Sequence, residues 1–333
     1  MNQGTTAEPA HASAPAQLYA PIARDLDEVE RILSESLRSR HPRVGEVVDH
    51  VRHYRGKRLR PVLLLLTARA CGPVTPAHHI LGAVVEMIHT ATLVHDDVLD
   101  NALVRRHVPT VNAGWGTQAS ILLGDHLFTH AFHLASTVDA RACRLIGEAT
   151  NRVCEGELRQ GLERGNLELS EHDYFEIIEG KTAELIACCC CLGAVYAGAG
   201  DAIGDSLARY GRWLGIAFQI ADDLLDLVGE ERATGKSLGT DVEQQKLTLP
   251  LIRLLQTGTN GAASQARQIL LSPGNHKREA LLPCLAAGDA LDYARRQAAE
   301  FASRARAELS CLALSPCRAL LELLTEQVIH RDH

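Results

Sequence analysis

The sequence has 333 residues, of which 46% are apolar and 4% aromatic, and its formal net charge at pH 7 is −7. This length can bury a large core, and the abundance of Ala, Leu, Glu and Arg over β-branched and aromatic residues predicts an all-α fold. The negative charge argues against nucleic acid as a partner, so an anionic ligand would need a local basic cluster.

Residues 1–20 are rich in Ala, Pro, Ser and Thr and contain no apolar leader, so we expect a flexible tail before a single domain at 21–333. The uncharged stretch 185–200 is shorter than the ~20 residues that cross a bilayer, so we expect no integral membrane segment. It contains four of the ten cysteines, Cys188 to Cys191. Successive helical side chains diverge, which favours small buried side chains over a metal site, and so many thiols suit a reducing cytoplasm.

Helical periodicity begins near Pro21, and the loop-like segment HYRGKRLRP at 53–61 leads into an apolar helix that stops at a Gly-Pro pair. A long helix is predicted from Pro76 to about Ala102. Further helices are predicted at roughly 117–136, 139–162, 171–180, 182–199 and 202–229, and again from Leu249 onward. The polar, glycine-containing segment 229–246 is long for a loop in a compact domain and is typical of a lid, a binding loop or a disordered stretch.

Two acidic clusters share the spacing D-D-x-x-D. They are Asp96, Asp97 and Asp100 in HDDVLD, and Asp222, Asp223 and Asp226 in ADDLLD. Positions i and i+4 lie on one face of a helix, where a like-charge pair costs about 0.2–0.5 kcal/mol. Apolar flanks predict that these carboxylates project from core helices into a cavity and bind divalent cations such as Mg²⁺, which proteins hold with a few carboxylates, water and substrate phosphates. A solvated helix face is the alternative for either cluster alone.

Basic residues before and after the first acidic cluster provide candidate phosphate sites. Arg105 and Arg106 follow the first acidic cluster, and guanidinium groups suit phosphate oxygens. Lys57, Arg58 and Arg60 stand near a helix start, which also favours an anion, although a surface basic patch is an equal alternative. Two acidic metal sites beside two basic sites predict a protein in which two diphosphates meet.

The motifs GKRLRP, EMIHTATLVHDDVLDNALVRR, GKTAEL, FQIADDLLDLVG and TGKSLGTDVEQQKLTLPL occur in that order. From about Leu26 to its C-terminus the chain resembles the trans-type (all-E) isoprenyl diphosphate synthases, also called polyprenyl synthetases. The resemblance implies an isoprenoid synthase-type helical bundle around a central catalytic cavity, usually a homodimer. It also implies Mg²⁺-dependent condensation of isopentenyl diphosphate with an allylic diphosphate, such as farnesyl diphosphate, with release of diphosphate.

The same resemblance assigns roles by position. Mg²⁺ would be bound by Asp96, Asp100 and Asp222, supported by Asp97, Asp223 and Asp226. Isopentenyl diphosphate would contact Lys57, Arg60, His89 and Arg106. The allylic diphosphate would contact Arg105, Lys181, Lys236 and Lys246. The reacting carbons would be bordered by Thr182 and Gln219. Each also has a structural alternative, such as a core histidine at His89, a solvated lysine at Lys181 or a core amide at Gln219.

The residues before the first acidic cluster predict the product length. Ala91 and Thr92 precede it by about one helical turn, ~5.4 Å, which is close to one isoprene unit. In the resembled family, bulky aromatic residues there stop growth, so these small side chains predict an open path past Ile88 and a long-chain product, around octaprenyl. Phe128 and Phe132 are candidates for the tunnel floor or, equally, plain core residues. The rivals are a geranylgeranyl diphosphate synthase and a modulatory subunit of a heteromeric synthase.

Overall fold

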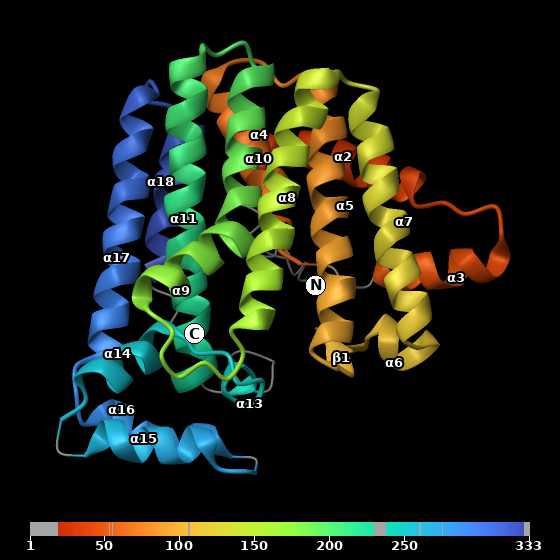
Figure 1. Cartoon of the computed structure of the whole chain (residues 1–333). Helices are drawn as coiled ribbons and strands as arrows, with labels where there is room; N and C mark the ends of the chain where they lie inside the picture. Colours follow the sequence, from red (N-terminus) through yellow and green to blue (C-terminus); the bar gives the residue numbers. More distant parts are fainter. Residues whose placement is uncertain are drawn as a thin grey trace, which may run out of the picture.

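The computed structural model describes residues 19–52, 54, 56–105, 107–229, 238–259, 261–274 and 276–329. Within these ranges the chain is a helical bundle with one two-stranded hairpin (Figure 1). The all-α prediction is confirmed. The predicted tail lies outside the described residues except for Tyr19 and Ala20.

The first half contains η1 (Ala20–Ile22), α2 (Ala23–Ser36), α3 (Pro42–Val51), α4 (Leu59–Cys71), α5 (Pro76–Leu99), β1 (Val104–Arg105), β2 (Val108–Pro109), α6 (Val111–Trp115), α7 (Thr117–Ser136) and α8 (Ala140–Leu162). The second half contains α9 (Glu171–Ile178), η2 (Glu179–Ala183), α10 (Glu184–Tyr196), α11 (Asp201–Val228), α13 (Thr240–Glu243), α14 (Leu249–Thr257), α15 (Ala262–Leu271), α16 (Lys277–Ala286), α17 (Ala290–Glu308), η3 (Leu309–Cys311) and α18 (Pro316–Ile329).

The core is built from helices that are apolar on most of their surface. In α4, Leu63 to Leu66 are all fully buried, as expected of a helix surrounded by others. Helix α10 packs between α4 and α11, and a Cβ on its Gly193 would lie 2.3 Å from the Leu64 carbonyl oxygen, so glycine allows a close helix approach. Cys188 to Cys190 are buried in this layer, which agrees with the interpretation of the cysteine run as core.

Helix α5 packs against α7, α2 and α4. Within the described ranges it is the one helix long and apolar enough to span a membrane by length and composition. However, 61% of its most apolar window is buried inside the protein, so core packing accounts for its hydropathy.

Two predicted boundaries were wrong. The long helix ends at Leu99 rather than Ala102, because Asn101 has φ +51° and turns the chain into the β1–β2 hairpin. No break occurs near Lys181, where two separate helices were predicted. Instead α9 continues into α10 through the π-helical turn η2, so the apolar pattern is interrupted without a loop.

Candidate active site

The two acidic clusters lie at the C-terminal ends of α5 and α11, at the same end of the bundle as the hairpin and α13 (Figure 1). Charges on Asp100 and Asp226 both act on Asp241 of α13. The structure therefore brings carboxylates of both predicted clusters together around one short helix.

Asp96 and Asp100 are the partly buried members of the first cluster. Burial raises the pKa of Asp96 to about 6; Lys181 opposes this rise, whereas Glu157 and Asp100 add to it. Asp100 accepts hydrogen bonds from Arg164 Nη2 at 2.9 Å and from Lys246 Nζ at 3.1 Å. The carboxylates at this end of α5 thus hold Lys181, Lys246 and Arg164 beside them.

Asp97 points to the opposite side and is almost fully buried. Its carboxylate accepts hydrogen bonds from Arg105 Nε at 2.7 Å and from the Tyr54 hydroxyl at 3.3 Å. The Tyr54 hydroxyl in turn accepts from the Val111 N–H at 2.9 Å. Asp97 therefore ties the end of α5 to the hairpin and α6, and it holds Arg105, the predicted contact to the allylic diphosphate.

In the second cluster, Asp222 is partly buried and Asp223 is buried. Asp223 accepts hydrogen bonds from the Tyr174 hydroxyl at 2.7 Å and from Gln219 Nε2 at 2.8 Å. Burial raises the pKa of Asp223 well above its usual range. Asp226 accepts hydrogen bonds from the Thr240 hydroxyl at 3.0 Å and from backbone N–H groups at the start of α13, so it also fixes that helix.

The sequence interpretation missed Asp241 and Glu157. Burial and Asp226 raise the pKa of Asp241 to about 6, while Lys246 and Lys181 lower it. Glu157 of α8 pairs with Lys181 at 2.5 Å. Asp241 stands inside a motif already quoted, TGKSLGTD, but a single acid in a polar segment has no periodicity that separates a site from a solvated loop.

The π-helical turn η2 presents Lys181 and Thr182. Glycines on both neighbouring helices admit this turn, since a Cβ on Gly156 of α8 would lie 2.4 Å from the Lys181 nitrogen and one on Gly215 of α11 would lie 2.6 Å from the Ala183 Cα. The Thr182 hydroxyl donates to Gln219 Oε1 at 2.8 Å. The two predicted polar neighbours of the reacting carbons are therefore in direct contact.

The remaining predicted residues fall into two groups. Arg106 and Lys236 lie outside the described residues. Lys57 is exposed at the start of α4, while Arg60 and His89 are partly buried on α4 and α5. Arg58 does not extend this basic cluster, because its guanidinium binds Glu30 and Glu86. Its inclusion in a phosphate site stays a prediction.

The predicted chain-length residues lie on two helices packed against each other. Ala91 and Ile88 of α5 are fully buried, and Thr92 is partly buried with its hydroxyl donating to the His89 carbonyl oxygen at 2.8 Å. On α7, Phe128 and Phe132 are partly buried against the core. The tunnel itself stays a prediction.

A model of the polyprenyl synthetase family matches residues 41–286. The chain belongs to the polyprenyl synthetase family. It is accordingly a prenyltransferase, as the motifs predicted.

Relatives and solved structures agree. Octaprenyl diphosphate synthase of Escherichia coli (strain K12) is 35% identical over 93% of this chain and 97% of that protein. Decaprenyl diphosphate synthase from Rhodobacter capsulatus has a TM-score of 0.89 and 35% identity, covering 96% of this chain and 99% of that one. Polyprenyl synthase from Caulobacter crescentus CB15, complexed with calcium and isoprenyl diphosphate, has a TM-score of 0.88 and 34% identity, covering 98% of this chain and all of that one. These similarities confirm the isoprenoid synthase-type fold.

The donor set fits a hard divalent cation. It consists of carboxylate oxygens without cysteine. Burial first, and neighbouring carboxylates second, raise the pKa values of Asp96 and Asp241, and a bound cation would offset both effects. Among the described residues no three His, Cys, Asp or Glu side chains converge to hold an ion unaided. This arrangement suits Mg²⁺, which keeps waters and shares its coordination with substrate phosphates.

Proposed function

We propose that this enzyme uses Mg²⁺ to condense isopentenyl diphosphate with an allylic diphosphate, and that it forms a long-chain all-trans product, around octaprenyl. The observation that carries the proposal is the meeting of the two aspartate clusters around Asp241, with Lys181 and Lys246 between them. Small side chains at Ala91 and Thr92 support a long product, as do the octaprenyl and decaprenyl synthases among its relatives.

The aspartates Asp96, Asp100 and Asp222 hold the cation, which when bound neutralises charge on the leaving diphosphate. Lys181 and Lys246, already drawn to this site by its carboxylates, bind the same diphosphate once it enters. Lys236 and Arg105 complete this set.

Thr182 and Gln219 border the allylic carbons. The Gln219 amide is fixed because its Nε2 donates to Asp223. Its Oε1 therefore points toward the Thr182 hydroxyl, and its dipole can also stabilise positive charge that develops on the allylic carbons. Tyr174 holds Asp223 from the other side. This buried chain of hydrogen bonds keeps oxygen dipoles in place while excluding water.

The second substrate binds beside α4 and α5, where Lys57, Arg60, His89 and Arg106 contact its diphosphate. Its double bond attacks the allylic carbon, and the proton that is then lost passes to the departing diphosphate.

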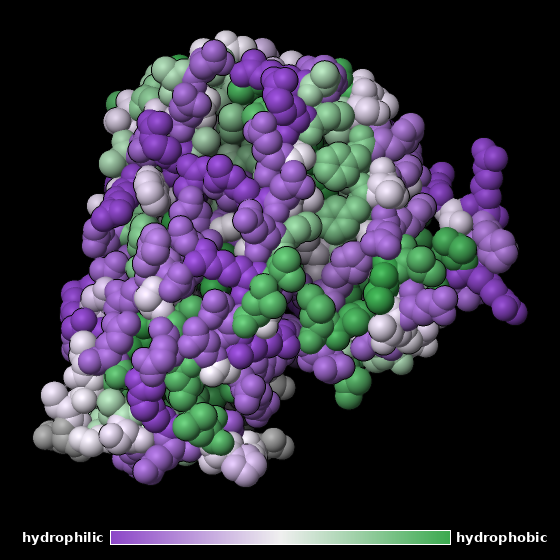
Figure 2. All heavy atoms as spheres, in the orientation of Figure 1, coloured by the Kyte–Doolittle hydropathy of each residue, from purple (hydrophilic) through white to green (hydrophobic). Residues whose placement is uncertain are grey.

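We also propose a cytoplasmic homodimer built from one domain, 21–333. Figure 2 shows apolar side chains gathered over the lower ends of α8 and α5 and toward α7. Exposed large apolar residues on α5, α7 and α8 and just after α5 include Leu99, Leu103, Ile121, Leu122 and Leu158. A patch of this kind is typical of a subunit interface.

The decisive experiment is product analysis. The purified protein is incubated with Mg²⁺, labelled isopentenyl diphosphate and farnesyl diphosphate, and the dephosphorylated products are sized by chromatography. Products near octaprenyl support the proposal. Arrest at geranylgeranyl would refute the open tunnel, and no elongation with any allylic primer would indicate a modulatory subunit. An Asp222→Asn variant is the control for activity from contaminating synthases.

A further inference from the structure

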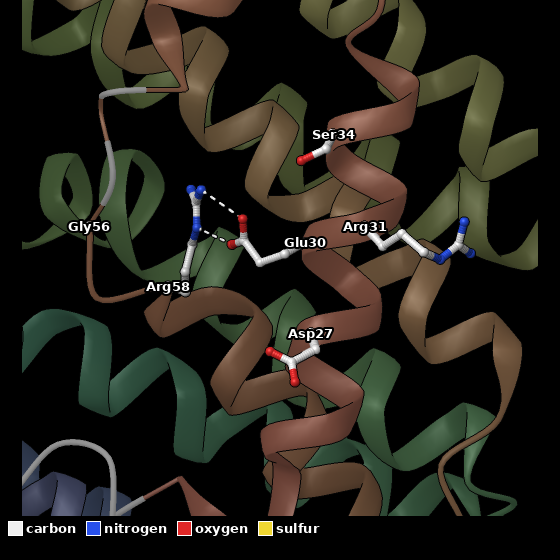
Figure 3. A pocket seen from close by; sticks show the side chains of 6 residues that line it. All are labelled: Asp27, Glu30, Arg31, Ser34, Gly56 and Arg58. Carbon is white, nitrogen blue, oxygen red and sulfur yellow. Dashed lines mark hydrogen bonds and ion pairs between the residues drawn. The ribbon is translucent and has the colours of Figure 1, made fainter. Parts of the chain in front are cut away.

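Arg58 joins three elements of the fold. Its Nε lies 2.5 Å from Glu30 Oε1 on α2, and its Nη1 lies 2.7 Å from Glu86 Oε1 on α5. Figure 3 shows the guanidinium and the Glu30 carboxylate in direct contact, with Arg31 pointing away from them, and all three residues line one open depression. Glu86 is almost completely buried, and Arg58 is its partner.

The backbone of Arg58 is unusual. Its φ of +50° and ψ of 36° place it in the left-handed region, directly before the first residue of α4. A residue with a side chain rarely adopts this conformation unless its surroundings hold it there. Here the two glutamates bind the side chain from opposite elements, so the same contacts that satisfy the charge fix the turn.

This turn lies between the predicted ligands of isopentenyl diphosphate. Lys57 precedes Arg58 directly, and Arg60 follows in the first turn of α4. On α5, Glu86 stands three residues before His89, which puts the two on one face of the helix about one turn apart. The Arg58–Glu86 pair therefore connects the segment with two of the ligands to the helix with the third.

We propose that Arg58 is a positioning residue for isopentenyl diphosphate. Its ion pairs with Glu30 and Glu86 hold the 57–60 turn at a distance from α5 at which the turn and the helix can bind the same diphosphate. Arg58 does not touch the substrate itself. This inference rests on the proposed function, because it takes its ligand from that assignment.

The test compares Arg58→Lys with Arg31→Lys. A lysine keeps the charge but is a single point, so it cannot bind two carboxylates in the fixed fork of a guanidinium. Arg31 lines the same depression and, among the described residues, pairs with Glu28 and Glu35 of its own helix, which makes it a matched control. For each variant we would measure kcat, the KM for both substrates and the midpoint of thermal unfolding.

For Arg58→Lys we expect the KM for isopentenyl diphosphate to rise about tenfold while the KM for farnesyl diphosphate stays within about twofold of the wild type. For Arg31→Lys neither constant should change. A lower unfolding midpoint with both KM values unchanged would overturn the proposal and leave Arg58 a stabilising residue only. A rise in both KM values would overturn it too, since the effect would then not be confined to one substrate.

Glu30→Gln keeps the proposal falsifiable if Arg58→Lys does not fold, because Glu30 is partly exposed and its loss leaves no buried charge unpaired. Glu30→Gln should raise the KM for isopentenyl diphosphate by about threefold, and an unchanged KM would contradict the positioning role of Arg58. Lys57→Ala distinguishes a failure of this inference from a failure of the proposed isopentenyl diphosphate site. If it raises the KM for isopentenyl diphosphate and Arg58→Lys does not, only the present inference fails. If it has no effect, the proposed substrate site fails and the inference with it.

Discussion

Asp241 lies between the two acidic clusters, and burial together with Asp226 raises the pKa of its carboxyl to about 6. A carboxyl whose pKa is higher in the folded than in the unfolded chain favours folding when protonated and opposes it when ionised. The stability that protonation gives is complete below the unfolded pKa, near 4, and is lost as the pH rises through about 6.

We therefore expect Asp241→Asn to stabilise the metal-free protein at pH 7.5 by about 1–3 kcal/mol, and by less at pH 4.5. Thermal unfolding followed by circular dichroism at the two pH values measures this difference. Asp292→Asn, at an exposed position of α17, is the control and should change neither midpoint. An equal gain at both pH values would show that ionisation of Asp241 is not the cause.

Tyr174 stabilises the position of Gln219 through Asp223. Removing its hydroxyl in Tyr174→Phe should lower kcat about tenfold and cost about 1–2 kcal/mol of stability. Tyr210→Phe is a matched control, because that buried hydroxyl donates to the Leu321 carbonyl oxygen at 2.9 Å, far along the chain from the site residues. It should lose similar stability at unchanged kcat. If both variants kept the wild-type kcat, Tyr174 would have no role in positioning.

Individual site residues could be predicted from the sequence where they belong to a repeated spacing. The D-D-x-x-D spacing pointed to six aspartates, but it could not separate Asp97, which faces Tyr54 and Arg105, from its neighbour Asp96. The ion pairs of Arg58 were also out of reach, since Glu30 and Glu86 each lie 28 residues away in the sequence and become neighbours only in the folded chain.

Among the elements, the π-helical turn η2 depends on how closely α8 approaches it. Gly156→Ala would place a Cβ 2.4 Å from the Lys181 nitrogen, so the turn must move and carry Lys181 and Thr182 with it. We expect kcat to fall at least about a hundredfold. Gly161→Ala, on the same helix with open space around it, should keep full activity and gain about 0.5–1 kcal/mol. Steady-state kinetics and thermal unfolding of the pair test this, and a fully active Gly156→Ala enzyme would contradict it.

Helices were predictable because most carry a strong apolar period. The predicted 117–136 and 202–229 agree within a residue with α7 and α11. The π-helical turn was not predictable, since it changes one hydrogen-bonding step without altering composition. The β1–β2 hairpin has two residues a strand, too few for an alternating pattern to appear.

Over the whole molecule, we propose that the growing chain runs between α5 and its neighbours. We expect Ala91→Phe to fill that path one turn below the aspartates and to shorten the product by several isoprene units, with the first condensation kept. Chromatography of the dephosphorylated products measures it. An unchanged product distribution in a folded variant would place the tunnel elsewhere.

If Phe128 forms the floor of the tunnel, Phe128→Ala should lengthen the product. An unchanged product length would instead make Phe128 a core residue.

The family and the fold followed from five motifs spread along the chain, because each is tied to one step of a shared chemistry. The number of subunits depends instead on surface side chains that no motif encodes. Residues such as Leu122 and Leu158 are unremarkable in sequence and stand out only by their exposure.

The direction of α5 and α11 has one more consequence. Both helices end where their aspartates stand, so the negative ends of two peptide dipoles add to the carboxylate charge, and neither helix has a basic residue in its last turn. This potential weakens the attraction that Lys181 and Lys246 exert on a bare diphosphate, and divalent cations on the diphosphate would restore it. We therefore expect the allylic diphosphate to bind more weakly when divalent cations are removed.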